Sequence, residues 1–73
     1  PASNLVQIET TGMDRRLTVN ITDALGKLMS TQEVHRKNVY ESFTIDVQLL
    51  PKGLYFVNIN DGNLFSTLKL IKQ

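Results

Sequence analysis

Residues that could carry chemistry are few and widely spaced along this chain. The single histidine, His35, stands in the short basic run His35-Arg36-Lys37 within a polar segment. We interpret it as an exposed loop residue rather than a general base or a metal ligand. No Gly-x-Ser-x-Gly sequence marks a serine nucleophile, and the chain has no cysteine for a thiolate metal centre or a disulfide. These residues point to no catalytic centre and to no cofactor.

The seven carboxylates are also explained without a catalytic role. Asp23 and Asp61 stand in turn sequences, and the others fall on polar strand faces or in loops. A glycosidase-type pair would need a cleft between two carboxylates, which so short a chain hardly offers. Oxygen ligands for calcium gather only at Asn60-Asp61-Gly62-Asn63, where a hairpin turn explains all four residues. We therefore predict neither a metal site nor enzymatic activity.

The composition limits the architecture and the partners. With 73 residues, of which 41% are hydrophobic and 21% are charged, the chain fits one globular domain over residues 1–73. A net charge of +1 is too small to attract nucleic acid or an anionic membrane. No apolar stretch approaches the roughly 20 residues that span a bilayer. Because the first residue is Pro1 rather than Met, we expect a domain excised from a longer protein.

Apolar and polar residues alternate with a period of two in short segments, a pattern typical of antiparallel strands with one buried face. In the third segment Leu28 and Met29 are adjacent, so the alternation there does not choose a face. The polar segment 32–41 is expected to be a long connection with at most one short extra strand around Val39 and Tyr40. The pattern predicts strands over residues 4–9, 16–22, 25–31, 42–48, 54–60 and 63–71.

Three turn sequences separate these strands. Asp23-Ala24-Leu25-Gly26 fits a type I turn followed by a glycine in the left-handed conformation. Leu50-Pro51-Lys52-Gly53 fits the same kind of turn, with proline at the second position. Asp61-Gly62 fits the centre of a two-residue type I′ hairpin. Six or seven short strands with a long middle connection predict an all-β, antiparallel two-sheet sandwich with a Greek-key connection.

Two neighbouring aromatic residues face opposite sides of the fifth expected strand. Tyr55 alternates in phase with Val57 and Ile59, which predicts core packing with its hydroxyl at a polar edge. Phe56 points to the other face, where it is either an exposed contact for a ligand or protein or is buried beneath a loop or the long connection.

The chain ends in a strand with two lysines, Lys69 and Lys72. Their spacing of three places them on opposite faces unless the strand ends or twists after Leu70. Lysines of this kind also keep a terminal edge strand soluble. If that edge is exposed, two copies of the domain could still pair through it.

Four segments together carry a pattern that is specific in its order and spacing. They are the N-terminal PASNLVQIE; LTVNITDALGKLM, through Val19, Ile21, Asp23, Gly26 and Lys27; FTIDVQLLPKGLYFVNI, through Ile45, Asp46, Leu50, Gly53 and Tyr55; and the tail LKLIK, through Lys69, Leu70 and Lys72. Over essentially the whole chain they resemble the type A C-terminal sorting domain of the bacterial type IX secretion system.

The resemblance implies an Ig-like β-sandwich that is covalently part of a larger cargo protein of the Bacteroidetes lineage. Such a domain directs folded cargo from the periplasm through the outer-membrane translocon, to the cell surface or into the medium. A sortase-like peptidase removes it in many cases, and the cargo is then anchored to a surface lipopolysaccharide. Two departures are that Val47 stands where the family often has Leu and that segment 32–41 matches no family feature.

The resemblance also assigns roles to individual residues. Its recognition residues are Gly53, Tyr55, Lys69 and Lys72, and the structural turn residues of the motif are Asp23, Gly26, Lys27, Pro51, Asp61 and Gly62. Apart from the resemblance, the candidate exposed contacts are Phe56, from the strand alternation, and Lys52. Our hypothesis is that the translocon reads the C-terminal hairpin, residues 54–72. Two alternatives are a carbohydrate-binding or adhesion module that uses Phe56 and Tyr40, and a purely structural Ig-like spacer.

Overall fold

The computed structural model describes residues 5–73, so Asn4, the expected first residue of the first strand, lies outside the described residues. This part of the chain contains strands and no helix. The strands are β1 (Leu5–Ile8), β2 (Arg16–Asp23), β3 (Leu28–His35), β4 (Phe43–Asp46), β5 (Gly53–Asn60) and β6 (Phe65–Lys72).

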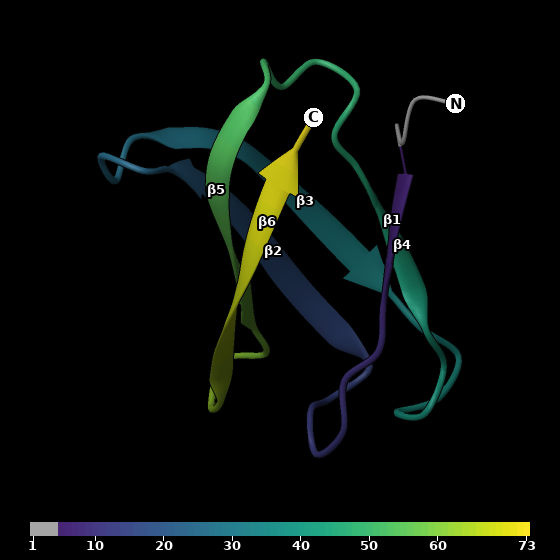
Figure 1. The fold of residues 1–73 in the computed structure, drawn as a ribbon. Coiled ribbons are helices and arrows are strands. Elements are labelled where there is room, and N and C mark those ends of the chain that lie inside the picture. Colours follow the sequence, from purple (N-terminus) through teal and green to yellow (C-terminus); the bar gives the residue numbers. More distant parts are fainter. Residues whose placement is uncertain (1–4) are drawn as a thin grey trace.

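The six strands form two antiparallel sheets (Figure 1). β1 pairs with β4 in a two-stranded sheet, and the other four strands pair in the order β3-β2-β5-β6. The chain leaves the larger sheet after β3 and forms β4 in the smaller sheet. It then returns to the larger sheet, where β5 lies beside β2 rather than beside β3. This return is a Greek-key connection, and the predicted all-β, Ig-like sandwich is confirmed.

Both sheets contribute to a single hydrophobic core. Leu17, Val19 and Ile21 alternate with polar residues in β2 and are almost completely buried. Each fully buried aliphatic side chain contributes about 1.5–3 kcal/mol relative to an exposed one. The rest of the core consists of Ile8, Met13, Phe43, Ile45, Val47, Leu50, Tyr55, Val57 and Ile59.

The third strand starts later than its sequence predicted. The carboxylate of Asp23 accepts hydrogen bonds from the N–H groups of Leu25 and Lys27, both at 2.9 Å. The Asp23 carbonyl also accepts one from Gly26, whose φ is 89°. These bonds make the expected turn, but they keep residues 24–27 out of the strand, so β3 runs over Leu28–His35 instead of 25–31.

The adjacent apolar residues of β3 are explained by a β-bulge. Ile21 pairs with Ser30, whereas Thr22 pairs with Leu28, so Met29 has no partner in β2. A bulge lets consecutive residues depart from strict alternation. As a result, Met29 packs against the core while Leu28 remains exposed.

The connection between β3 and β4 is shorter than predicted and contains no extra strand. His35 is exposed, but it is the last residue of β3 rather than a loop residue. Val39 and Tyr40 lie in a turn in which the Asn38 side chain accepts a hydrogen bond from the Tyr40 N–H at 2.9 Å. The connection thus holds none of the at most one extra strand predicted around these two residues, because local side-chain bonding favours a turn.

Two other turns are shifted by a few residues from the predicted positions. Between β4 and β5 the hydrogen-bonded turn joins Leu50 N–H to the Val47 carbonyl at 3.1 Å, before the predicted Pro-Lys-Gly turn. In the last hairpin, Asp61 N–H donates to the Leu64 carbonyl. Gly62 is thus the first central residue, and no described residue other than glycine has a positive φ. A type I′ turn needs positive φ at both central positions, so that prediction was wrong.

Candidate functional site

The outer face of the last hairpin presents apolar side chains around a lysine. β5 and β6 pair Leu54 with Ile71 and Phe56 with Lys69. These residues alternate out of phase with core residues of β5, so they lie on the face away from the smaller sheet. Phe56 is half-buried and the other three are exposed. We call Leu54, Phe56, Lys69 and Ile71 the hairpin patch; directly opposed side chains of this kind lie about 4.5–5.5 Å apart at Cβ.

Lys72 lies on the inner face, where it contacts the inter-sheet connection, the segment between β4 and β5 (residues 47–52). Its Nζ donates hydrogen bonds to the carbonyl oxygens of Val47, at 2.5 Å, and Gln48, at 3.0 Å. β6 continues to Lys72, so the two lysines lie on opposite faces as their spacing predicted. Lys72 therefore joins the last strand to the segment that follows β4, whereas Lys69 is exposed.

Tyr55 and Gly53 have conformational and packing roles in the same hairpin. Tyr55 is 4% exposed, and its hydroxyl donates to the Pro51 carbonyl at 2.5 Å. Gly53 pairs with Lys72 and has a φ of 152°, a value that residues with a Cβ rarely adopt. Among the four residues assigned to recognition, Lys69 is the one whose side chain is directed to solvent on the hairpin patch.

Asp61 organises the turn between β5 and β6. Its Oδ1 accepts hydrogen bonds from the N–H groups of Asn63, at 2.8 Å, and Leu64, at 2.7 Å. Its Oδ2 accepts one from Asp14 N–H at 2.9 Å, which joins this turn to the loop between β1 and β2. The bonds from Leu64, Asp14 and Asn63 stabilise the charged carboxylate and lower the pKa of Asp61 below its ordinary value.

The remaining assigned residues flank the two hairpins and the inter-sheet connection. Lys27 and Lys52 are exposed, the first beside the β2–β3 turn and the second just before β5. Pro51 also is exposed and contributes its carbonyl to Tyr55. The structure thus brings Phe56 and Lys69 together on one face of the β5–β6 hairpin, while Lys27 belongs to the β2–β3 hairpin.

A comparison with family models gives a match over residues 1–73 to the secretion system C-terminal sorting domain. The chain belongs to this family. Its members are the sorting signals at the C-termini of type IX secretion cargo proteins, which are exported to the cell surface or secreted. No curated protein and no solved structure matches the chain.

Membership favours the export signal over the carbohydrate-binding alternative. The two aromatic residues proposed for glycan contact lie on different elements of the sorting domain, Phe56 in β5 and Tyr40 in the turn before β4.

Sorting domains of this family are not catalytic. The described residues contain no cluster of three or more potential metal-binding side chains. Over the same part of the chain, no helix is long and apolar enough to cross a membrane.

Arg36 is a buried residue of the sorting domain that the sequence interpretation missed. Only 6% of it is exposed, although it belongs to the polar segment 32–41, which the sequence predicts to be a long connection. Its guanidinium donates to Thr10 Oγ1 at 2.9 Å and to the carbonyl oxygens of Val39 and Glu41, both at 3.2 Å. It also donates to the carbonyls of Met13 and Asp14 and lies 5.8 Å from the centre of the Phe43 ring.

The acceptors explain why Arg36 could not be identified from the sequence. All but one are main-chain carbonyls, and a carbonyl oxygen is present at every position of any sequence. Arginine suits this position because its planar guanidinium offers five donors to several acceptors at once. Arg36 therefore joins the loop after β1 to the β3–β4 connection.

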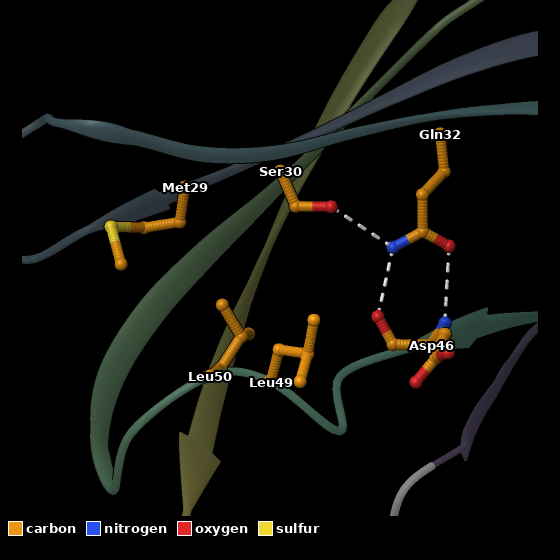
Figure 2. A pocket seen from close by; sticks show the side chains of 6 residues that line it. All are labelled: Met29, Ser30, Gln32, Asp46, Leu49 and Leu50. Carbon is orange, nitrogen blue, oxygen red and sulfur yellow. Dashed lines mark hydrogen bonds between the residues drawn. The ribbon is translucent and has the colours of Figure 1, made fainter.

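A hollow of about 470 Å³ lies between β3 and the connection after β4 (Figure 2). At one end the Gln32 amide binds the main chain of Asp46, donating to its carbonyl at 2.8 Å and accepting from its N–H at 3.1 Å. The amide also donates to Ser30 Oγ at 3.2 Å. Gln32 thus mimics the peptide group of a neighbouring strand and joins the two sheets, while Leu49 and Leu50 border the apolar part of the hollow.

Proposed function

We propose that the type IX translocon recognises this sorting domain through the hairpin patch on the outer face of β5 and β6. Phe56 and Lys69 lie opposite each other in this patch, and Leu54 lies opposite Ile71 in the next pair. By contrast, the buried or hydrogen-bonded side chains of Tyr55 and Lys72 stabilise the fold. A translocon that recognises folded cargo can contact only exposed side chains. The observation that carries the proposal is that Leu54, Lys69 and Ile71 are exposed together on the outer face of the hairpin.

The chemistry of the patch suggests the surface that would bind it. Neither cross-strand pair contains an acidic residue, so the patch has one positive charge among three apolar side chains. Apolar centres and complementary charges are the usual basis of affinity and specificity in protein interfaces. A shallow apolar groove with one carboxylate at its rim would fit this arrangement. Lys52, exposed just before β5, would lie at the edge of the same contact.

We further propose that residues 1–73 form a single domain joined covalently to a larger cargo, which it accompanies from the periplasm through the outer membrane. A sortase-like peptidase would then act on the exported protein, and the domain itself would carry out no reaction. Supporting this, the single histidine is exposed at a strand end, and the carboxylates of Asp23 and Asp61 accept backbone hydrogen bonds in turns.

The test is export of a reporter that carries the 73-residue chain at its C-terminus in a bacterium with a type IX system. Lys69→Glu reverses the charge of the patch, and Lys37→Glu makes the same change at an exposed position in the β3–β4 connection. We expect Lys69→Glu to lower the exported fraction at least about tenfold, equivalent to about 1.4 kcal/mol of binding, with accumulation in the periplasm.

The Lys37→Glu fusion should be exported like the unsubstituted one, and thermal unfolding should show that both variants fold. Equal export of the two variants would contradict recognition through the hairpin patch. Deleting β6 is a weaker test, because it also removes Lys72 and the partly buried Leu70 and so would damage the fold.

A further inference from the structure

β6 lies at one edge of the larger sheet (Figure 1). Among residues 5–73 it pairs with β5 alone. Asp61 N–H bonds the Leu64 carbonyl at the start of the hairpin, and hydrogen-bonded and non-hydrogen-bonded pairs alternate along antiparallel strands. The backbone groups of alternate residues therefore point away from β5. These residues are Phe65, Thr67, Lys69 and Ile71.

The edge has little of the protection that proteins normally give an exposed strand. Its eight residues pair with β5 without a register shift, and they include no proline. Charged side chains, bulges and prolines are the usual devices that prevent edge-to-edge pairing. Of the two lysines in the strand, Lys72 is hydrogen-bonded to carbonyls of the inter-sheet connection, which leaves Lys69 as the exposed charge.

We propose that two copies of this sorting domain pair through β6 in antiparallel fashion, with the two-fold axis at Leu68. In this register the hydrogen-bonded pairs are Thr67 with Lys69 of the second copy and Phe65 with Ile71 of the second copy. All four residues point their backbone groups outward, as the pairing requires. The two four-stranded sheets would join into one continuous sheet of eight strands.

The side chains favour this register over its neighbours. Phe65 is 78% exposed, Ile71 is 61% exposed and Leu68 is 41% exposed. The axis at Leu68 pairs Phe65 with Ile71 twice and Leu68 with itself, so each exposed apolar side chain gains an apolar partner.

Registers shifted by one residue or two create poorer pairs. An axis at Thr67 would place Lys69 opposite Phe65, an axis at Lys69 would place two lysines opposite each other, and an axis at Leu70 would place Lys72 opposite Leu68. Like charges directly opposed across strands are destabilising. The proposed pairing goes beyond export, because the hairpin patch needs only one copy, and the pairing can fail or succeed independently of translocon recognition.

A cysteine scan of the 73-residue chain tests the register, since the chain has no cysteine of its own. The Cα atoms of a non-hydrogen-bonded pair lie about 4.5 Å apart, which is within the range of a disulfide. Leu68→Cys should therefore give a covalent dimer under mild oxidation. Leu70→Cys is the matched control, because its two copies would lie roughly four residues, or about 14 Å, apart. Equal cross-linking of both variants, or none at Leu68→Cys, would overturn the proposal.

Sedimentation equilibrium of variants without cysteine gives an independent measurement. The unsubstituted chain should show a concentration-dependent dimer, and Thr67→Pro, which removes an outward N–H, should weaken dimerisation at least about tenfold. Thr67→Val retains that N–H and loses the hydroxyl bond to Asn58 Oδ1, so it should associate like the unsubstituted chain. A monomer at all concentrations, or equal association of the proline and valine variants, would also overturn the proposal.

Discussion

At the scale of single residues, Asp61 links the final hairpin to a distant part of the chain. Its carboxylate accepts N–H groups from its own turn and from Asp14, in the loop between β1 and β2. Hydrogen bonds to a carboxylate favour its charged form and lower its pKa. The ionised carboxylate of Asp61 therefore stabilises the turn that joins β5 to β6, at the end of the hairpin away from the hairpin patch.

This dependence predicts how the stability of the domain changes with pH. Because the pKa of Asp61 is lowered in the folded state, its contribution is complete above the ordinary value of 3.8 and is lost as the pH falls through the lower folded pKa. We expect the free energy of unfolding, measured by urea titration from about pH 5 to about pH 2, to fall less steeply for Asp61→Asn than for the unsubstituted chain. Equal slopes would show that the carboxylate does not contribute.

Residue types alone indicated part of the candidate site. Alternation placed Phe56 and Tyr55 on opposite faces and separated Lys69 from Lys72, because strand geometry has a fixed period. The contacts of Lys72 with Val47 and Gln48, and those of Arg36 with Met13 and Asp14, could not be predicted, since the acceptors are carbonyl oxygens of segments remote in sequence.

At the scale of elements, two side chains of the last hairpin hold the connection between the sheets, residues 47–52. The Tyr55 hydroxyl bonds the Pro51 carbonyl, and Lys72 bonds the carbonyls of Val47 and Gln48. The final strand thus stabilises a segment that begins about 25 residues earlier. Truncation of the C-terminus would loosen this connection as well as the edge of the sheet.

The two lysines of β6 should therefore differ in their effects on stability. Lys72→Met removes two charge-assisted hydrogen bonds of a half-buried side chain, so we expect the free energy of unfolding to fall by about 1–2 kcal/mol. Lys69→Met changes an exposed residue and should stay within about 0.5 kcal/mol of the unsubstituted chain. Urea unfolding measures both. If Lys69→Met were the more destabilising substitution, the contacts of Lys72 would contribute little.

Element positions followed from the sequence where one face of a strand is buried. β2 and β5 lie in the middle of the larger sheet and bury every second residue along most of their length, and both were predicted to within one residue at each end. β3 was misplaced because it is an edge strand with a bulge and mostly polar residues, so no continuous apolar face marks its ends. Its pairing with β2 could be seen only in the structure.

At the scale of the whole molecule, the two sheets are unequal. Within residues 5–73, the larger sheet has β2 and β5 between two outer strands, whereas the smaller sheet consists of β1 and β4. A two-stranded sheet is at best marginally stable by itself. Its stability here depends on the shared core and on side chains that cross between the sheets, of which Gln32 is bonded directly to the main chain of β4 (Figure 2).

Native-state hydrogen exchange should reveal this inequality. Local opening has a lower free energy where fewer contacts are buried, so amides of β2 and β5 should exchange most slowly and those of β1 and β4 faster. Gln32→Met keeps a long side chain but removes both bonds to Asp46. We expect it to accelerate exchange at Asp46 and its pairing partners in β1 by about tenfold, the equivalent of about 1.4 kcal/mol, and to leave β5–β6 amides unchanged. Uniform acceleration in both sheets would instead show that the sandwich opens only as one cooperative unit.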